Sequence, residues 1–351
     1  MNPQTQLCPI CQTDGKDGKI GIHSRREKRY RCKVCQHTFS ESRGTAAYGL
    51  KKPDIFFVVV TLLAYGCPPQ AIVAAFHLSE NTVRAWLKRS GQHCQAVHEQ
   101  TVGRRQWDLQ HLQADELKVK TQVGTLWLAM VMMVSTRLWL GAALDTTRSK
   151  AMIIACLAQA SRCALCRPLL LAVDGFNMYA NAVKKTFRSQ HPIGKGGRMK
   201  WVSWNTIVIT QVVKQRGNVR GHIEQVVLQG EAEVAQRLRA CSNGGTMINT
   251  AYIERLNATF RQRLAYLARR TRTQVRQTQT LSAATFLMGS VYNFCTPHAS
   301  LALPLYLPHH RRYWVKRTPA MAAGLTDHRW TITELLSYRV NKPSTSSRYS
   351  A

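Results

Sequence analysis

Acidic residues are scarce in this sequence of 351 residues. Only 18 are Asp or Glu, against 49 Lys and Arg, which gives a formal net charge of +31. The imbalance extends along the whole chain, and between Glu233 and Asp327 the only acidic residue is Glu254. A field of this sign attracts polyanions and makes their binding dependent on salt. The charge therefore favours nucleic acid as the partner and leaves few candidates for a carboxylate site.

Long apolar runs are missing as well. The longest, 55–67 and 126–134, fall short of the about 20 residues that span a bilayer. No N-terminal apolar segment is typical of a secretory signal. The sequence thus predicts no membrane partner and a cytoplasmic, nucleoid-associated location.

The cysteines do not indicate a disulfide framework, because there are eleven of them in a long chain. Four form two knuckles, CPIC with Cys8 and Cys11, and CKVC with Cys32 and Cys35. Each knuckle offers two thiolates from one turn, and two knuckles complete a tetrahedral cage for Zn²⁺. With four protein ligands such a site is structural, so we expect a zinc ribbon over residues 1–45.

Basic residues crowd the segment between the two knuckles. Residues 23–32 spell HSRREKRYRC and place Arg25, Arg26 and Arg29 near Tyr30. We expect these arginines to contact DNA phosphate, with a solvated basic hairpin as the alternative.

Apolar periodicity predicts helices between Pro53 and His98. The first ends near Gly66, and PPQAIVAAFHL and SENTVRAWLKRSGQH follow, the last with Ser79 as its N-cap. A helix, a short turn and a second helix rich in bases and amides are typical of a helix-turn-helix domain, here over 50–105, although a plain helical hairpin has the same periodicity. The residues expected to face the major groove of DNA are Asn81, Thr82, Arg84 and Lys88.

From Leu109 onward the sequence predicts strands and helices in alternation. Three consecutive strands are expected from the segments ADELKVK, TLWLAMVMMVST and RLWLGAALDTT. A buried strand before an Asp-Gly turn is expected from PLLLAVDGF. KAMIIACLAQA and residues 179–187 are expected to be helical, and 206–213 to form another strand. This pattern indicates an α/β fold with a mixed sheet flanked by helices over 109–300, followed by a basic C-terminal tail over 301–351.

Asp115 is the first acid without an ordinary role. The period of two in a strand places Asp115 on the apolar face, and Glu116 on the face of Lys118 and Lys120. The two lysines on the same face give the charge of Glu116 an ordinary explanation. A carboxylate on an apolar face, by contrast, needs a partner or a metal ion.

Asp174 and Glu254 complete the set of candidate acids. Asp174 follows a buried strand, where sites collect in α/β sheets, although the chemistry of an Asp-Gly turn also explains it. Glu254 lies on an expected amphipathic helix, NTAYIERLNATFRQRLAYLARR, and no base stands three or four residues away to pair with it. Carboxylates of this kind suit Mg²⁺, and two such ions can promote displacement at a phosphodiester.

In these motifs the chain resembles the DDE transposases of bacterial insertion sequences, in the group typified by insertion sequence one. The resemblance lies in ADELKVK, VDGFNMY and YIERLNATFRQRL, and it extends to the cysteine ribbon, the helix-turn-helix and the C-terminal TPAMAAGLTDHRWT. It implies a ribonuclease-H-like core that uses two Mg²⁺ or Mn²⁺ ions, cleaves DNA at the ends of the element and joins the freed 3′-hydroxyl to target DNA.

The resemblance also implies roles for individual residues. Asp115, Asp174 and Glu254 would hold the catalytic metal ions, and Asn257 and Arg261 would contact DNA near the site. The zinc ribbon and the helix-turn-helix would recognise the terminal inverted repeats. The expected partners are double-stranded DNA and further copies of this chain bound to it.

Two features depart from compact members of that family. Asp174 and Glu254 are 80 positions apart, which makes residues 214–247 a candidate insert, and the DNA-binding and catalytic parts lie in one chain. Two other classes remain open. One is a zinc-ribbon, helix-turn-helix transcriptional regulator without catalysis, and the other is a ribonuclease-H-like nuclease such as a junction resolvase.

Overall fold

The computed structural model describes residues 2–25, 29–193, 198–214, 223–271, 273–306 and 313–340. Arg26, expected to contact DNA, lies outside the described residues. Among the helices that are described, none combines the length and the apolar character needed to cross a membrane.

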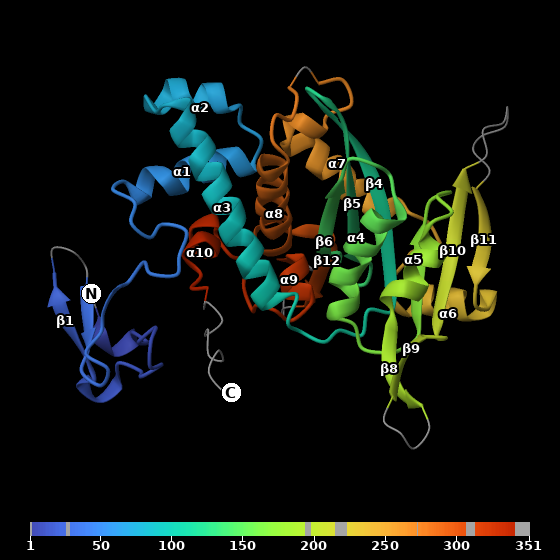
Figure 1. The fold of residues 1–351 in the computed structure, drawn as a ribbon, viewed down its shortest axis with the longest axis horizontal. Helices are drawn as coiled ribbons and strands as arrows, with labels where there is room; N and C mark the ends of the chain where they lie inside the picture. The colour runs from blue at the N-terminus through green and yellow to red at the C-terminus, as the bar shows by residue number, and fades with distance from the viewer. Residues whose placement is uncertain are drawn as a thin grey trace.

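A six-stranded mixed sheet forms the centre of the larger part of the molecule (Figure 1). Its strands, in spatial order, are β11 (Ile223–Gln229), β10 (Ile207–Lys214), β7 (Leu169–Val173), β4 (His111–Thr121), β5 (Gly124–Met133) and β6 (Leu138–Asp145). β4, β5 and β6 form an antiparallel meander, whereas β7 is parallel to β4 and β10 is parallel to β7. The mixed sheet predicted from the sequence is confirmed.

Helices cover both faces of this sheet (Figure 1). α7 (Ala251–Arg263) and α8 (Thr278–Cys295) pack on the face of β4 that carries Leu117 and Val119. α4 (Lys150–Arg162) and α5 (Tyr179–Thr186) pack on the opposite face, which carries Leu112. The alternation of side chains along β4 thus supplies apolar surface to two separate helical layers.

The three N-terminal helices share the hydrophobic core of α7 and α8. They are α1 (Pro53–Ala64), α2 (Pro69–Phe76) and α3 (Glu80–Thr101). Phe56, Ile72 and Leu87 are buried together with Leu287 of α8. Within the described ranges, the expected helix-turn-helix segment 50–105 therefore has no core separate from that of the sheet.

Close packing of α3 against α8 depends on Gly91. A Cβ at this position would lie 2.2 Å from the carbonyl oxygen of Ala283, a distance at which backbone must move. The absent side chain lets the two helices approach.

Much of the segment 301–351, expected as a basic C-terminal tail, forms helices and strands in the described residues. β12 (His298–Leu305) pairs with β13 (Tyr313–Arg317), and α9 (Pro319–Ala322) and α10 (Ile332–Ser337) follow. Ile332, Leu335 and Leu336 are buried in the core that contains α1 and α3. Burial of these apolar residues fixes the segment; residues 341–351 lie outside the described part of the chain.

The candidate insert at 214–247 is, where described, continuous with the main sheet. β11 pairs antiparallel with β10 and forms the edge of the sheet. α6 (Ala232–Cys241) then packs against β7 and β10, where Ala235 is buried with Leu170 and Val208.

A small separate sheet lies in the N-terminal part of the chain (Figure 1), formed by β1 (Ile20–Ser24), β2 (Arg29–Cys32) and β3 (Thr38–Ser40). Cys32 ends β2, and the other three cysteines of the two knuckles lie outside these strands. Two backbone hydrogen bonds connect the following segment to the C-terminal part of the chain. The amide of Ala46 donates to the carbonyl of Leu336 at 2.9 Å, and the amide of Val340 donates to that of Gly44 at 3.0 Å.

Candidate metal centre

Two neighbouring parallel strands bring Asp115 and Asp174 together. Ala114 of β4 is in register with Val173 of β7, so each acid is the next residue along its chain. One carboxylate oxygen each of Asp115, Glu116 and Asp174 lie within 4.8 Å of one another. The structure therefore groups two of the three predicted acids, together with a third that was not predicted.

Glu116 is buried, and its interpretation from the neighbouring lysines is wrong. Its side chain has no exposed surface, whereas Lys118 and Lys120 are exposed. Oε2 accepts hydrogen bonds from Arg148, from Nη2 at 2.6 Å and from Nε at 3.1 Å, and Oε1 accepts one from the hydroxyl of Tyr179. Burial raises the pKa of Glu116, and the hydrogen bonds from Tyr179 and Arg148 oppose that rise.

Glu254 lies outside this group of three acids, but its charge affects the pKa of Asp115, which belongs to the group. Oε1 of Glu254 accepts a hydrogen bond from the hydroxyl of Thr250 at 2.7 Å. Burial, followed by the charge of Asp174, raises the pKa of Asp115 to about 7, and the charge of Glu254 contributes to that rise. The predicted third ligand is thus near Asp115, although its oxygens are not among those that converge.

Asn257 is buried beside Asp115, and its predicted contact with DNA stays a prediction. It is 1% exposed, and its Nδ2 donates to Oδ2 of Asp115 at 2.6 Å. Gln113, also on β4, fixes the start of the same helix. Its Oε1 accepts from the amide of Ile253 at 2.9 Å, and its Nε2 donates to the carbonyl of Asn249 at 2.5 Å.

Arg261 lies one turn beyond Asn257 on α7 and is half-buried. Burial and the nearby Arg269 lower the pKa of Arg261, while the charge of Asp115 acts in the opposite direction. The guanidinium is therefore within electrostatic range of the acids, and its contact with DNA stays a prediction.

Arg148 is a member of the site that the sequence did not indicate. Its Nη2 lies 2.6 Å from Oε2 of Glu116 and 3.3 Å from Oδ2 of Asp174. The guanidinium carbon is 4.0 Å from the ring centroid of Phe176 and 5.4 Å from that of Trp127. Burial acts to lower the pKa of Arg148, but Glu116 and Asp174 raise it on balance.

The oxygens of Asp115 and Asp174 fit a hard divalent cation. Oδ1 of Asp115 accepts from the amide of Glu116, and Oδ1 of Asp174 accepts from the amide of Phe176. Each of these oxygens accepts that hydrogen bond with one lone pair and keeps another for a metal ion such as Mg²⁺. Glu116 instead receives three hydrogen bonds from Arg148 and Tyr179, which suits a supporting role.

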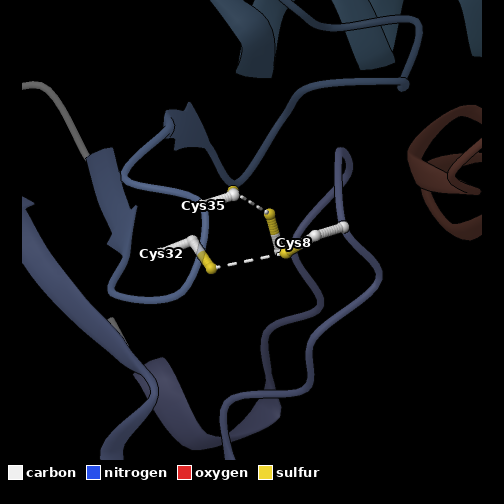
Figure 2. A group of neighbouring side chains, drawn as sticks. Cys8, Cys32 and Cys35 are labelled. Atoms are coloured by element: carbon white, nitrogen blue, oxygen red, sulfur yellow. Dashed lines mark hydrogen bonds between the residues drawn. The ribbon is translucent and has the colours of Figure 1, made fainter.

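The four cysteines of the ribbon form a second candidate metal group, as predicted. Figure 2 labels three of them, Cys8, Cys32 and Cys35. The sulfurs of Cys8 and Cys35 are 3.5 Å apart, and those of Cys11 and Cys32 are 3.6 Å apart. A tetrahedral Zn²⁺ with Zn–S distances near 2.3 Å separates its sulfurs by about 3.8 Å. Both separations are slightly shorter than this, so the arrangement fits zinc after a small increase in the two sulfur–sulfur distances.

Predicted DNA-contacting residues on α3 are at the surface, except for one. Asn81, Arg84 and Lys88 are exposed, whereas Thr82 is half-buried. The hydroxyl of Ser79 accepts from the amide of Thr82 at 3.1 Å, which confirms the predicted N-cap.

In the ribbon, Arg25 is exposed and Arg29 is half-buried. Nη2 of Arg29 donates to the hydroxyl of Thr38 on β3 at 2.6 Å. Arg29 thus contributes to the ribbon's own structure, and its predicted contact with phosphate stays a prediction.

No protein-family model matches this chain, and no curated protein sequence matches it. The functional conclusion therefore depends on the chemistry of its own residues.

Proposed function

We propose that this protein is a DNA transposase of the DDE type, in the insertion-sequence-one-like group, with a ribonuclease-H-like core. The observation that carries the proposal is the convergence of Asp115 and Asp174 beside the helix of Glu254. The hydrogen bond from Asn257 to Asp115 ties that helix to the same strand. One acid on β4, one directly after the adjacent strand β7 and one on a neighbouring helix supply carboxylates from three parts of the chain.

In this proposal Asp115, Asp174 and Glu254 hold two Mg²⁺ or Mn²⁺ ions. When bound, such ions activate the attacking oxygen and stabilise the leaving oxygen in phosphodiester displacement. Asn257 and Gln113 keep the two elements in register. Arg261 offers a positive charge to a DNA phosphate beside the acids.

The rest of the chain supports binding of double-stranded DNA. The net charge of +31 suits neutralisation of DNA phosphates. The cysteine ribbon and α3 carry exposed basic side chains, and we propose that these two parts recognise the inverted repeats. Transposition joins two element ends to one target, so we propose that copies of the chain assemble on the DNA.

Strand transfer in vitro tests the proposal. The substrate is duplex DNA carrying the inverted repeats that flank the coding region, with Mn²⁺ present. We expect the wild-type chain to join the 3′-hydroxyl to target DNA, and Asp115→Asn, Asp174→Asn and Glu254→Gln to bind the ends without joining them. Glu231→Gln, at an exposed acid away from the site, should retain joining.

Other outcomes point to other classes. Binding of the ends by wild-type protein without divalent-dependent cleavage would identify a transcriptional regulator. Cleavage of branched DNA without joining would identify a nuclease. Either result contradicts the proposed transposase.

A further inference from the structure

We infer that Arg148 is an internal counter-cation of the acid group, which competes with the divalent ion for Asp174 and so lowers the metal affinity of the site. The inference rests on the proposed function in one respect, namely that these acids bind a divalent cation. It concerns the arrangement of three side chains, Arg148, Glu116 and Asp174.

One half of the arrangement is a firm anchor. Two nitrogens of Arg148 donate to the same oxygen of Glu116, at 2.6 and 3.1 Å, and Tyr179 donates to the other oxygen. The Glu116 side chain has no exposed surface. Removing a donor from a buried carboxylate is costly, so Arg148 stays attached to Glu116.

The other half is a weak contact. The bond from Nη2 of Arg148 to Oδ2 of Asp174 is longer, at 3.3 Å, and the Asp174 side chain is 40% exposed. Mg²⁺ binds carboxylate oxygens at about 2.0 to 2.1 Å. An entering ion can therefore replace Arg148 at Asp174 while leaving its contact with Glu116 in place.

Aromatic rings keep the guanidinium next to the acids after such a replacement. Arg148 lies over Phe176 at 4.0 Å and near Trp127 at 5.4 Å. The amide of Phe176 also donates to Oδ1 of Asp174 at 3.1 Å, so one residue orients both the acid and its counter-cation. The positive charge of Arg148 then repels a divalent ion at Asp174. Removing the Arg148 guanidinium should therefore tighten metal binding.

Binding of Mn²⁺ to the zinc-loaded full-length chain tests this inference without measuring catalysis. Free Mn²⁺ is followed by electron paramagnetic resonance during titration. We expect Arg148→Gln to bind Mn²⁺ roughly three- to tenfold more tightly than wild type, as a partly exposed charge contact would allow. Arg148→Lys keeps the charge but loses the forked geometry, so its affinity should lie between the two.

A matched control separates this effect from the loss of a positive charge in general. Arg167 forms an exposed pair with Asp108 at 3.2 Å, away from the acid group. Arg167→Gln removes one arginine and its pair with Asp108, whereas Arg148→Gln removes one arginine and its pairs with Glu116 and Asp174. Arg167→Gln should leave Mn²⁺ affinity unchanged.

A second variant covers the case in which Arg148→Gln fails to fold because Glu116 loses its partner. Arg148→Gln combined with Glu116→Gln leaves no buried carboxylate without its donor, and it should bind Mn²⁺ more tightly than Glu116→Gln alone, since these two differ only at Arg148. Unchanged or weaker binding, in folded Arg148→Gln against wild type or in the double variant against Glu116→Gln, overturns the inference while leaving the proposed function standing. If wild type shows no Mn²⁺ site that Asp174→Asn removes, the proposed function fails as well.

Discussion

Nδ2 of Asn257 donates a hydrogen bond of 2.6 Å to Oδ2 of Asp115, and this bond joins helix α7 to strand β4 inside the acid group. Asn257 is 1% exposed and comes from a segment 142 positions away from Asp115 in sequence. The orientation of the most buried candidate ligand thus depends on a residue from a distant part of the chain.

Replacing Asn257 by Ala should weaken Mn²⁺ binding by about 10- to 100-fold, the usual effect of removing a residue that orients a metal ligand. Titration of the zinc-loaded protein with Mn²⁺ measures this. Gln262→Ala, at an exposed position of the same helix, is the control and should match wild type. Equal affinity in the Asn257 variant would show that Asp115 needs no such support.

Asp115 gives the site a definite pH dependence. Burial, then the charge of Asp174, raises the pKa of Asp115 to about 7. Because the folded protein holds this proton more tightly than the unfolded chain does, the contribution of Asp115 to stability falls as pH rises from about 4 to about 7. Urea unfolding without divalent ions should therefore show that Asp115→Asn gains stability over wild type as pH rises through that range. A difference that is constant with pH would contradict the raised pKa.

The cysteine group should bind one zinc ion per chain. Cys32→Ser removes a buried ligand and should abolish the bound zinc, which elemental analysis of the purified protein measures. Cys166→Ser, at an exposed cysteine outside the group, should keep the metal. Equal zinc in both variants would remove the ribbon's role as the zinc site.

Gly91 provides a test of the packing between α3 and α8. On helix propensity alone, Ala at this position would stabilise the helix by about 1 kcal/mol. The Cβ would lie 2.2 Å from the carbonyl oxygen of Ala283, so we expect Gly91→Ala to destabilise the fold by about 1 to 3 kcal/mol instead. Chemical denaturation measures the change, with Gln92→Ala, at the exposed neighbouring position, as the control. A stabilised Gly91 variant would mean that the two helices lie further apart.

Local patterns in the sequence predicted several parts of this structure. The spacing of the cysteines predicted their grouping, because each pair comes from one turn. The buried strand before Asp174 and the alternation around Asp115 predicted two acids on the sheet, and the parallel pairing of β4 with β7 brings them together.

Glu116 was missed because the alternation in a strand defines two faces but not what covers each of them. α4 and α5 cover the part of the face that holds Glu116 and leave Lys118 and Lys120 exposed. Arg148, its partner, is 32 positions away in sequence, so no local spacing connects the two. The helical period likewise placed Asn257 on the same side of its helix as Glu254. It did not predict that Asn257 is buried against the sheet.

The folded C-terminal segment did leave a signal that its basic composition concealed. Ile332, Leu335 and Leu336 stand at the spacing of an apolar helix face, and Thr331 with Glu334 forms a capping box at its start. These features predict the helix α10 that the structure contains.

The way α10 completes the core has a consequence for synthesis of the chain. α1 and α3 are made before α8 and α10, the helices that cover their apolar faces. The amides of Ala46 and Val340 then join the two regions by hydrogen bonds. A nascent chain therefore exposes the apolar faces of α1 and α3 until α8 and α10 have been made, and this exposure makes incomplete chains targets for chaperones and proteases.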